Sequence, residues 1–203
     1  MSSDTYFYIE RKGAEADSPA LFLLHGTGGD EHQFFDLAAE LKPGARRIAP
    51  RGDVSEGGAL RYFKRFAEGK FDMPDLARAT SKMAGFVRDH LGVEKPSDVI
   101  GLGYSNGANI LAAVQFEAPE LFDTAVLLHP MIPFVPEPQP GLKGKRVLIT
   151  AGRRDPICPA PATQTLADYF AAQGADVGIF WHEGGHEIRQ EELAAVHEFL
   201  VRK

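Results

Sequence analysis

The sequence predicts an α/β fold in which a mainly parallel β-sheet is covered by helices on both faces. Short apolar runs of strand length alternate with longer segments of helical periodicity along most of the 203 residues. Such alternation is typical of βα units, which place their strands side by side in one parallel sheet. The length suits one hydrophobic core, and neither an internal repeat nor a linker divides the chain. We therefore expect a single domain over residues 1–203.

The first half of the chain contains three expected strands and two expected helices. Residues 6–10 predict a short edge strand, 21–24 a central buried strand, and 47–49 a short strand that ends at Pro50. Apolar residues at helical spacing predict an amphipathic helix over 31–41. A longer helix is expected over 74–91, with Gly92 ending it.

The second half repeats a strand followed by a helix. Strands are expected at 99–102, 125–128, 147–151 and 177–181, and helices at 109–117, 161–173 and 189–202. A proline-rich loop, rather than a helix, follows the strand at 125–128. The other strands are each followed by a helix, so a parallel arrangement is predicted.

Composition and charge exclude several classes of protein. The chain is 44% hydrophobic and has a formal net charge of −6, which opposes binding to nucleic acid phosphates. The single cysteine, Cys158, cannot form an internal disulfide. Residues 1–5 lack the order of a signal peptide, and no apolar run approaches the roughly 20 residues of a membrane helix. We expect a cytoplasmic protein without a nucleic acid or membrane partner.

The segment Gly103-Tyr104-Ser105-Asn106-Gly107 has the pattern Gly-x-Ser-x-Gly and lies between an expected strand and an expected helix. In that context the serine occupies a strained turn that exposes its side chain at the end of the sheet. The flanking glycines are required because a Cβ at either position would clash with the neighbouring strand and helix. The pattern predicts that Ser105 is a nucleophile.

Two further residues complete a catalytic triad. Asp155 follows the strand at 147–151, and His186 follows the strand at 177–181. The carboxyl ends of parallel strands lie at one edge of a sheet, where Ser105 is also expected. The chain order Ser, Asp, His is that of α/β-hydrolases. We predict that His186 is the general base and that Asp155 orients it.

A glycine-rich turn follows the strand at 21–24 and supplies a fourth element. Acyl transfer requires backbone N–H groups that stabilise the oxyanion of the tetrahedral intermediate. The turn over residues 25–30 leaves such groups free to point at one place. The N–H groups of Thr27 and Asn106 are the predicted oxyanion hole.

These motifs, at residues 24–30, 103–108, 152–157 and 184–187, are distributed over nearly the whole chain. Together they resemble the small bacterial serine esterases of the phospholipase/carboxylesterase family, which have the α/β-hydrolase fold. The resemblance implies a serine carboxylic-ester hydrolase without a cofactor, and a possible homodimer. The family also includes lysophospholipases and acyl-protein thioesterases. This chain has Thr27 where those eukaryotic-type relatives usually have leucine, a departure from the long-chain acyl enzymes.

Two long irregular stretches, 54–73 and 131–142, are expected to cover the active edge, because loops of this length in a compact domain are usually functional. Neither is long enough to form a helical lid domain. Their apolar side chains are the candidate walls of a pocket for small or medium acyl or aryl esters. The predicted substrate-binding residues are Phe63, Phe66, Met131, Ile132 and Phe134.

Two cofactor motifs occur in the sequence but are not favoured. His182-Glu183-Gly184-Gly185-His186 matches the zinc motif His-Glu-x-x-His, which requires a helix, whereas two adjacent glycines oppose one. Gly101-Leu102-Gly103 begins a dinucleotide fingerprint but lacks its third glycine at the required spacing. We expect neither a metal nor a nucleotide cofactor, and we interpret His182 as the polar end of a strand.

The remaining polar residues are given structural roles. His25 is expected to bind loop backbone, Cys158 to pack in a loop, and His129 to be a surface or packing residue, as are His32, His90 and His197. A cationic group (Arg51, Arg61, Lys64 and Arg65) is interpreted as a solvated loop rather than a contact for an acidic substrate. Two other functions stay open: hydrolysis of thioesters, amides or C–C bonds, and a binding module without catalysis.

Overall fold

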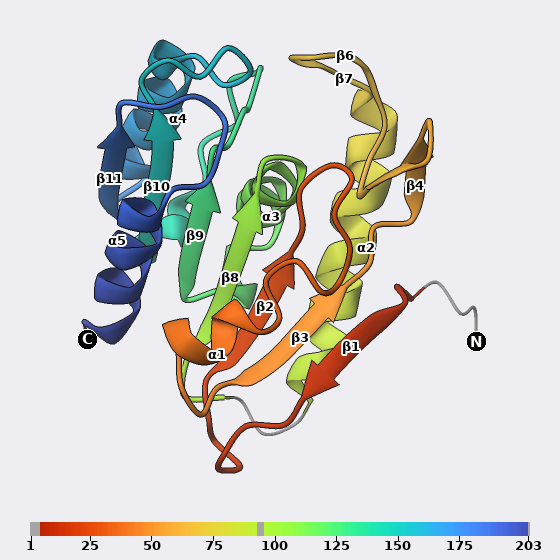
Figure 1. The fold of residues 1–203 in the computed structure, drawn as a ribbon, viewed down its shortest axis with the longest axis vertical. Helices are drawn as coiled ribbons and strands as arrows, with labels where there is room; N and C mark the ends of the chain where they lie inside the picture. The colour runs from red at the N-terminus through yellow and green to blue at the C-terminus, as the bar shows by residue number, and fades with distance from the viewer. Residues whose placement is uncertain (1–4, 93–95, 203) are drawn as a thin grey trace.

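The computed structural model describes residues 5–92 and 96–202 and contains a seven-stranded sheet (Figure 1). The strand order is β1-β3-β2-β8-β9-β10-β11, and every pairing is parallel except that of β1 with β3. The strands are β1 (Tyr8–Arg11), β2 (Ala20–Leu24), β3 (Arg46–Pro50), β8 (Val99–Tyr104), β9 (Thr124–Leu128), β10 (Arg146–Gly152) and β11 (Asp176–His182). The predicted mainly parallel sheet is confirmed.

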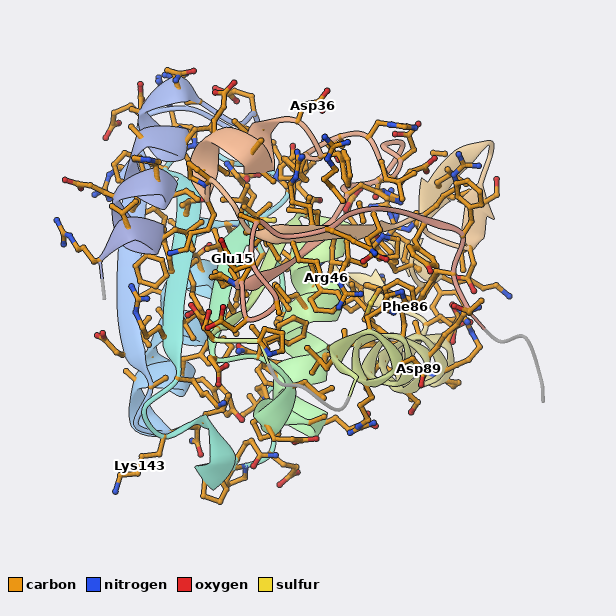
Figure 2. All side chains as sticks on the ribbon, turned by 90° about the horizontal axis from the view of Figure 1, so that it is seen from below. Glu15, Asp36, Arg46, Phe86, Asp89 and Lys143 are labelled. Atoms are coloured by element: carbon orange, nitrogen blue, oxygen red, sulfur yellow. The ribbon has the colours of Figure 1, made fainter. Side chains whose placement is uncertain are left out.

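Helices cover both faces of this sheet, as predicted. Figure 2, seen along the sheet, shows α1 (Leu37–Leu41) and α5 (Gln190–Val201) on one side. On the other side lie α2 (Met73–Leu91), α3 (Asn106–Glu117) and α4 (Ala160–Ala172). Two short 3₁₀ helices, η1 (Pro119–Leu121) and η2 (Pro140–Leu142), complete the helical elements of the described residues.

Each face of the sheet has its own hydrophobic core, because successive strand residues point to opposite faces. In β2, Phe22 and Leu24 pack with α2 and α3, whereas Leu21 and Leu23 pack with α1 and α5. All four side chains are buried, so β2 is a central strand, as its continuous apolar sequence predicts.

The helix expected over 31–41 is shorter in the structure, since only Leu37–Leu41 is α-helical. Side chains in the preceding segment bind the backbone locally and so compete with helical hydrogen bonds. The Asp30 carboxylate accepts the N–H of His32 at 2.9 Å, and the Gln33 amide oxygen accepts the N–H of Gly26 at 2.8 Å. The segment is held as turns against the loop after β2.

The stretch over residues 54–73 is not an irregular loop but two β-hairpins, which the sequence analysis missed. They are formed by β4 (Val54–Glu56) with β5 (Ala59–Arg61) and by β6 (Arg65–Ala67) with β7 (Lys70–Phe71). Gly57 and Gly58 connect the first pair with φ of 59° and 94°, the backbone that tight hairpin turns require. Both hairpins lie toward the carboxyl ends of the parallel strands (Figure 1).

None of the helices in the described residues combines the length and apolarity needed to cross a membrane. Residues 1–4, on which part of the argument against a signal peptide rests, lie outside the described ranges. The cytoplasmic location and the homodimer stay predictions.

Candidate active site

Ser105 lies at the turn between β8 and α3 and has a left-handed backbone with φ of 51°. This conformation is strained for a residue other than glycine. Neighbouring backbone explains the two glycines of the motif. A Cβ on Gly103 would lie 2.4 Å from the carbonyl oxygen of Gly107, and one on Gly107 would lie 2.2 Å from that of Leu24. The predicted turn and the reason for its glycines are confirmed.

The structure brings Ser105, His186 and Asp155 together in one hydrogen-bonded chain. His186 Nε2 lies 2.9 Å from Ser105 Oγ, and His186 Nδ1 lies 2.7 Å from Asp155 Oδ2. The loops after β11 and β10 supply the histidine and the aspartate. The Tyr104 hydroxyl donates to the His186 carbonyl oxygen at 2.7 Å and so fixes the histidine loop. This is the arrangement of a nucleophile, a base and an orienting carboxylate.

The Asp155 carboxylate is fully buried but has several donors. Its Oδ1 accepts the backbone N–H groups of Ile157 at 2.8 Å and Cys158 at 2.9 Å. Burial alone would raise the pKa of Asp155. Hydrogen bonds from His129, His186 and the Cys158 amide outweigh that effect and hold the pKa well below its ordinary value. The carboxylate is therefore ionised at neutral pH.

A small cavity adjoins Ser105 and is lined by Thr27 and Asn106, the two residues of the predicted oxyanion hole. Asn106 is the first residue of α3, so its backbone N–H has no acceptor within the helix. Its side chain is 1% exposed. The side-chain oxygen accepts the N–H of Tyr62, while the amide nitrogen has no acceptor among the described residues. The side-chain nitrogen of Asn106 is thus a buried donor without a partner among the described residues.

Arg61 lines the same cavity and is only 2% exposed, so the interpretation of Arg61 as part of a solvated loop is wrong. Its Nη1 donates to Thr27 Oγ1 at 2.6 Å, and its Nε lies 3.3 Å from Glu56. Arg65 and Glu68, which form an ion pair, also line the cavity. Charged side chains therefore line this cavity together with the apolar side chains of Phe71, Met131 and Ile157.

The predicted apolar substrate pocket is largely not formed. Phe63 is fully buried in the core and packs against Phe71 with ring centroids 4.9 Å apart, so its prediction as a substrate contact is wrong. Ile132 is 9% exposed and belongs to the same core. Phe66 is exposed beside β4, and Phe134 lines a separate groove between α2 and α3. Of the five residues, Met131 lines the cavity at Ser105.

His129 was interpreted as a surface or packing residue, and the structure corrects this. It is fully buried, has φ of 50°, and places Nδ1 2.9 Å from Asp155 Oδ2. Its Nε2 lies 3.3 Å from Oε1 of Glu192 in the first turn of α5. The sequence could have indicated a place for His129 at the active edge, because this residue directly follows the strand at 125–128, as Asp155 and His186 follow their strands.

His25, in contrast, has the structural role that the sequence suggests. Its Nδ1 donates to the carbonyl oxygen of Gly26 at 2.8 Å, and its Nε2 accepts the N–H of Gly52 at 2.8 Å. The ring therefore joins the loop after β2 to the loop after β3, and this holds the turn that contains Thr27.

Two sets of side chains have the residue types of a metal site, and the first of them, His129, Asp155 and His186, is the hydrogen-bonded cluster described above. Donor atoms of His129, His182 and Glu192 lie within 4.8 Å of one another. However, His182 Nδ1 accepts the N–H of Gly184 at 3.0 Å, so the ring proton is on Nε2, which points into the cluster. A nitrogen that carries its proton cannot ligate a metal. The zinc motif is also not on a helix, since His182 ends β11 and residues 183–187 form a bend.

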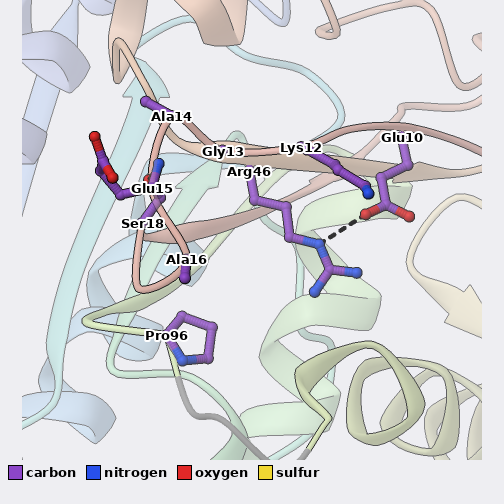
Figure 3. Close-up of a pocket in the computed structure, with 9 residues that line it drawn as sticks. All are labelled: Glu10, Lys12, Gly13, Ala14, Glu15, Ala16, Ser18, Arg46 and Pro96. Carbon is purple, nitrogen blue, oxygen red and sulfur yellow. Dashed lines mark hydrogen bonds and ion pairs between the residues drawn. The ribbon is translucent and has the colours of Figure 1, made fainter.

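A second cavity, of about 480 Å³, lies near the amino ends of β2, β3 and β8 (Figure 3). Arg46 crosses it to form an ion pair with Glu10 at 2.8 Å. Its one hydroxyl, on Ser18, accepts the N–H of Glu15, and no histidine is among the described residues that line it. The chemistry of a hydrolase is therefore found at the carboxyl edge.

Comparisons with known proteins agree with this geometry. Residues 76–194 match the model of the dienelactone hydrolase family. The chain is 37% identical to the hydrolase MhqD of Bacillus subtilis over 95% of this chain and 96% of that protein. The solved structure of protein Atu2452 of Agrobacterium tumefaciens, whose function is unknown, is 55% identical over 98% of this chain and 98% of that chain, with a TM-score of 0.91. The structure of the Bacillus cereus carboxylesterase is 34% identical over 98% of this chain and 94% of that chain, with a TM-score of 0.92. The chain therefore belongs to the dienelactone hydrolase family and is an ester-hydrolysing enzyme with the α/β-hydrolase fold.

Proposed function

We propose that this enzyme hydrolyses carboxylic esters through an acyl-enzyme on Ser105. The supporting observation is the continuous chain of contacts from Ser105 Oγ to His186 Nε2 at 2.9 Å and from His186 Nδ1 to Asp155 Oδ2 at 2.7 Å. Because the buried carboxylate accepts a hydrogen bond from Nδ1–H, the neutral ring presents an unprotonated Nε2 to the serine hydroxyl. That tautomer is the one that a general base requires.

The reaction then has two halves. Ser105 Oγ attacks the ester carbonyl carbon while His186 Nε2 takes the hydroxyl proton, and the same proton passes to the departing alcohol. Water next attacks the acyl-enzyme, gives its proton to His186, and releases the acid as Ser105 is restored. Backbone N–H groups of Thr27 and Asn106, which line the cavity beside Ser105, are the proposed donors to the oxyanion in both halves.

The cavity favours a small and polar acyl group. Its volume is only about 20 Å³, and its lining includes Arg61 and the Arg65–Glu68 ion pair beside Phe71 and Met131. Phe63, the strongest candidate for an apolar wall, is in the core. A long alkyl chain would desolvate the charged groups without replacing their hydrogen bonds, which is unfavourable. We therefore propose small to medium acyl or aryl esters as substrates, in preference to lysophospholipids.

A fluorophosphonate probe and a panel of p-nitrophenyl esters test this proposal. The probe should label the wild-type chain at one residue, Ser105, and should leave the Ser105→Ala variant unlabelled. Hydrolysis rates should be highest for acetate and butyrate esters and should fall for octanoate and longer chains. The matching thioesters belong in the same panel. Faster cleavage of long-chain thioesters than of short esters would contradict the proposed substrate class, and absence of labelling would contradict the nucleophile.

A further inference from the structure

Asp155 Oδ2 is shared by two imidazole rings whose centroids lie 5.2 Å apart. His186 Nδ1 lies 2.7 Å away on the side of Ser105, where the histidine side chain is 18% exposed. His129 Nδ1 lies 2.9 Å away on the interior side, where the histidine side chain is fully buried. Since an ionised carboxylate oxygen only accepts hydrogen bonds, both nitrogens must donate to it.

The other nitrogen of the interior ring also faces a carboxylate. His129 Nε2 lies 3.3 Å from Oε1 and 3.4 Å from Oε2 of Glu192, whose side chain is fully buried. Glu192 otherwise accepts the hydroxyl of Thr150 and the backbone N–H of Arg189. A buried carboxylate is costly unless a positive charge is near. The imidazole between Asp155 and Glu192 is the group placed to supply that charge, by donating from both nitrogens.

The other titratable groups around His129 do not replace it as the cation. His182 accepts the Gly184 N–H at Nδ1, so its Nε2 carries a proton, and this nitrogen lies 3.4 Å from His129 Nε2 and 3.7 Å from Glu192 Oε2. From β8, the ring of Tyr104 lies 5.9 Å from that of His129, and burial raises the pKa of Tyr104 to about 12. Burial likewise raises the pKa of Cys158, whose Sγ donates to the His129 carbonyl oxygen. Both groups are neutral near pH 7.

We propose that His129 is a positioning residue: a buried imidazolium that bridges Asp155 to Glu192 and fixes the carboxylate that orients His186. This inference rests on the triad mechanism proposed above. The bridge ties the loop after β10 to β9 and α5, so Asp155 Oδ2 cannot turn away from His186. The positive charge also opposes part of the field that Asp155 exerts on the base. Burial lowers the pKa of His129, but the hydrogen bonds to Asp155 and Glu192 outweigh it and raise the pKa to about 9.

Two substitutions separate the two contacts of the ring. In His129→Asn the amide nitrogen can take the place of Nδ1 and keep the contact with Asp155. In His129→Gln it can take the place of Nε2 and keep the contact with Glu192 instead. Loss of the Asp155 contact should lower kcat by roughly 10- to 100-fold, the size of a lost hydrogen bond to a charged group, with little change in KM. His129→Asn should retain clearly more activity than His129→Gln.

The pH profile distinguishes positioning from a purely structural role. Both variants remove the buried cation, so the field of Asp155 on the base is no longer opposed. The acidic limb of kcat/KM should then move to higher pH by about one unit. His197→Asn, at an exposed histidine of α5, is the matched control and should leave the profile unchanged. Equal activity of the Asn and Gln variants with an unmoved limb would overturn the inference.

A measurement on the wild-type chain covers the case in which the variants fail to fold. Nitrogen-15 NMR of histidine-labelled protein should show one imidazole doubly protonated at pH 7.5 and titrating near pH 9. A neutral His129 at that pH, or a stoichiometric metal that is absent from the His129→Asn variant, would overturn the proposal. If Ser105→Ala retained activity, the triad mechanism itself would fail, and that result is separate from any result at His129.

Discussion

Asp155 divides the site into two halves that differ in solvent access and in charge. On the substrate side, His186 is partly exposed, Ser105 is held in a strained turn, and a cavity of about 20 Å³ adjoins the serine. On the interior side, His129 and Glu192 are fully buried and hydrogen-bonded. The substrate side must change its protonation during each turnover. The interior side keeps its charges, and it can therefore hold the shared carboxylate still while the protons move.

The two halves also differ in how their interactions contribute to stability. Electrostatic interactions are stronger in the buried half because water does not screen them, and the same burial makes an unpaired charge costly. In the substrate half, strain at Ser105 is the main local cost. Substitutions in the substrate half should therefore reduce activity more than stability, and substitutions in the interior half should reduce both.

The largest effect is expected for Ser105→Ala, which removes the nucleophile and little packing. Activity should fall by a factor on the order of 10⁶, the loss seen for the nucleophile of a serine protease, while the midpoint of urea unfolding stays the same or rises slightly as strain is relieved. Steady-state kinetics and urea titration measure the two quantities. Retention of more than a few per cent of activity would refute the acyl-enzyme.

A somewhat smaller effect is expected for Asp155→Asn, because the shared residue serves both halves. The amide has only one oxygen, so its NH₂ group must face either the two imidazole donors or the backbone N–H groups of Ile157 and Cys158. The equivalent change in a serine protease lowers kcat by about 10⁴. Unlike Ser105→Ala, this variant should also unfold at lower urea concentration, since the imidazolium of His129 loses a partner. Full activity with reduced stability would mean that Asp155 is structural.

Glu192→Gln tests the interior half alone. The change keeps the shape of the side chain but leaves the His129 imidazolium without one of its two carboxylates. Breaking a buried pair costs about 3 kcal/mol of unfolding free energy, measurable by urea denaturation at pH 7. Glu187→Gln is the control, because Glu187 lies beside His186 at the surface and its ion pair with Arg189 is exposed to solvent. Equal effects at both positions would show that burial does not matter here.

The sequence predicted the substrate half of the site more completely than the interior half. Ser105, Asp155 and His186 each follow a strand, and all three belong to patterns with a known order. His129 follows a strand as well, but no motif includes it, so it was interpreted as packing. Glu192 could not be found in this way, because it reaches the site only when α5 packs across the sheet next to β10. The strands of the main sheet and the α-helices were predicted within a few residues, except at 31–36, whereas the two hairpins formed by β4 to β7 were missed.

The prediction of an apolar substrate pocket was wrong for a related reason. The aromatic residues of 54–73 suggested an exposed apolar wall, yet this segment folds as hairpins that dock on α3. The Tyr62 N–H donates to the Asn106 side chain at 2.8 Å, and Phe63 is buried beneath it. Arg61 ends β5, whereas Tyr62 and Phe63 lie in the bend before β6, where both rings enter the core. In this segment, Arg61 lines the cavity and Phe63 does not.

The last predicted effect is a gradual fall in stability as pH rises from about 6.5 to 9. The pKa of His129 is about 9 in the folded chain, against about 6.5 for an unfolded histidine. The folded state thus binds more protons than the unfolded state between these values, so unfolding free energy decreases with rising pH. The stabilisation is complete below about pH 6.5 and is lost through pH 9. Its full size is roughly 3 kcal/mol, at about 1.4 kcal/mol for each pH unit.

The low pKa of Asp155 changes the unfolding free energy only in acid, and the raised pKa of Tyr104, about 12, changes it only above pH 10. Neither group therefore contributes to the slope between pH 6.5 and 9. Urea unfolding at pH 6, 7.5 and 9 measures the slope in the wild-type chain and in His129→Asn. The variant has no titrating group at this position and should lose most of the slope, whereas the exposed control His197→Asn should keep it. A wild-type slope that survives in His129→Asn would place the titrating group elsewhere, and the interior half would then not depend on a charged histidine.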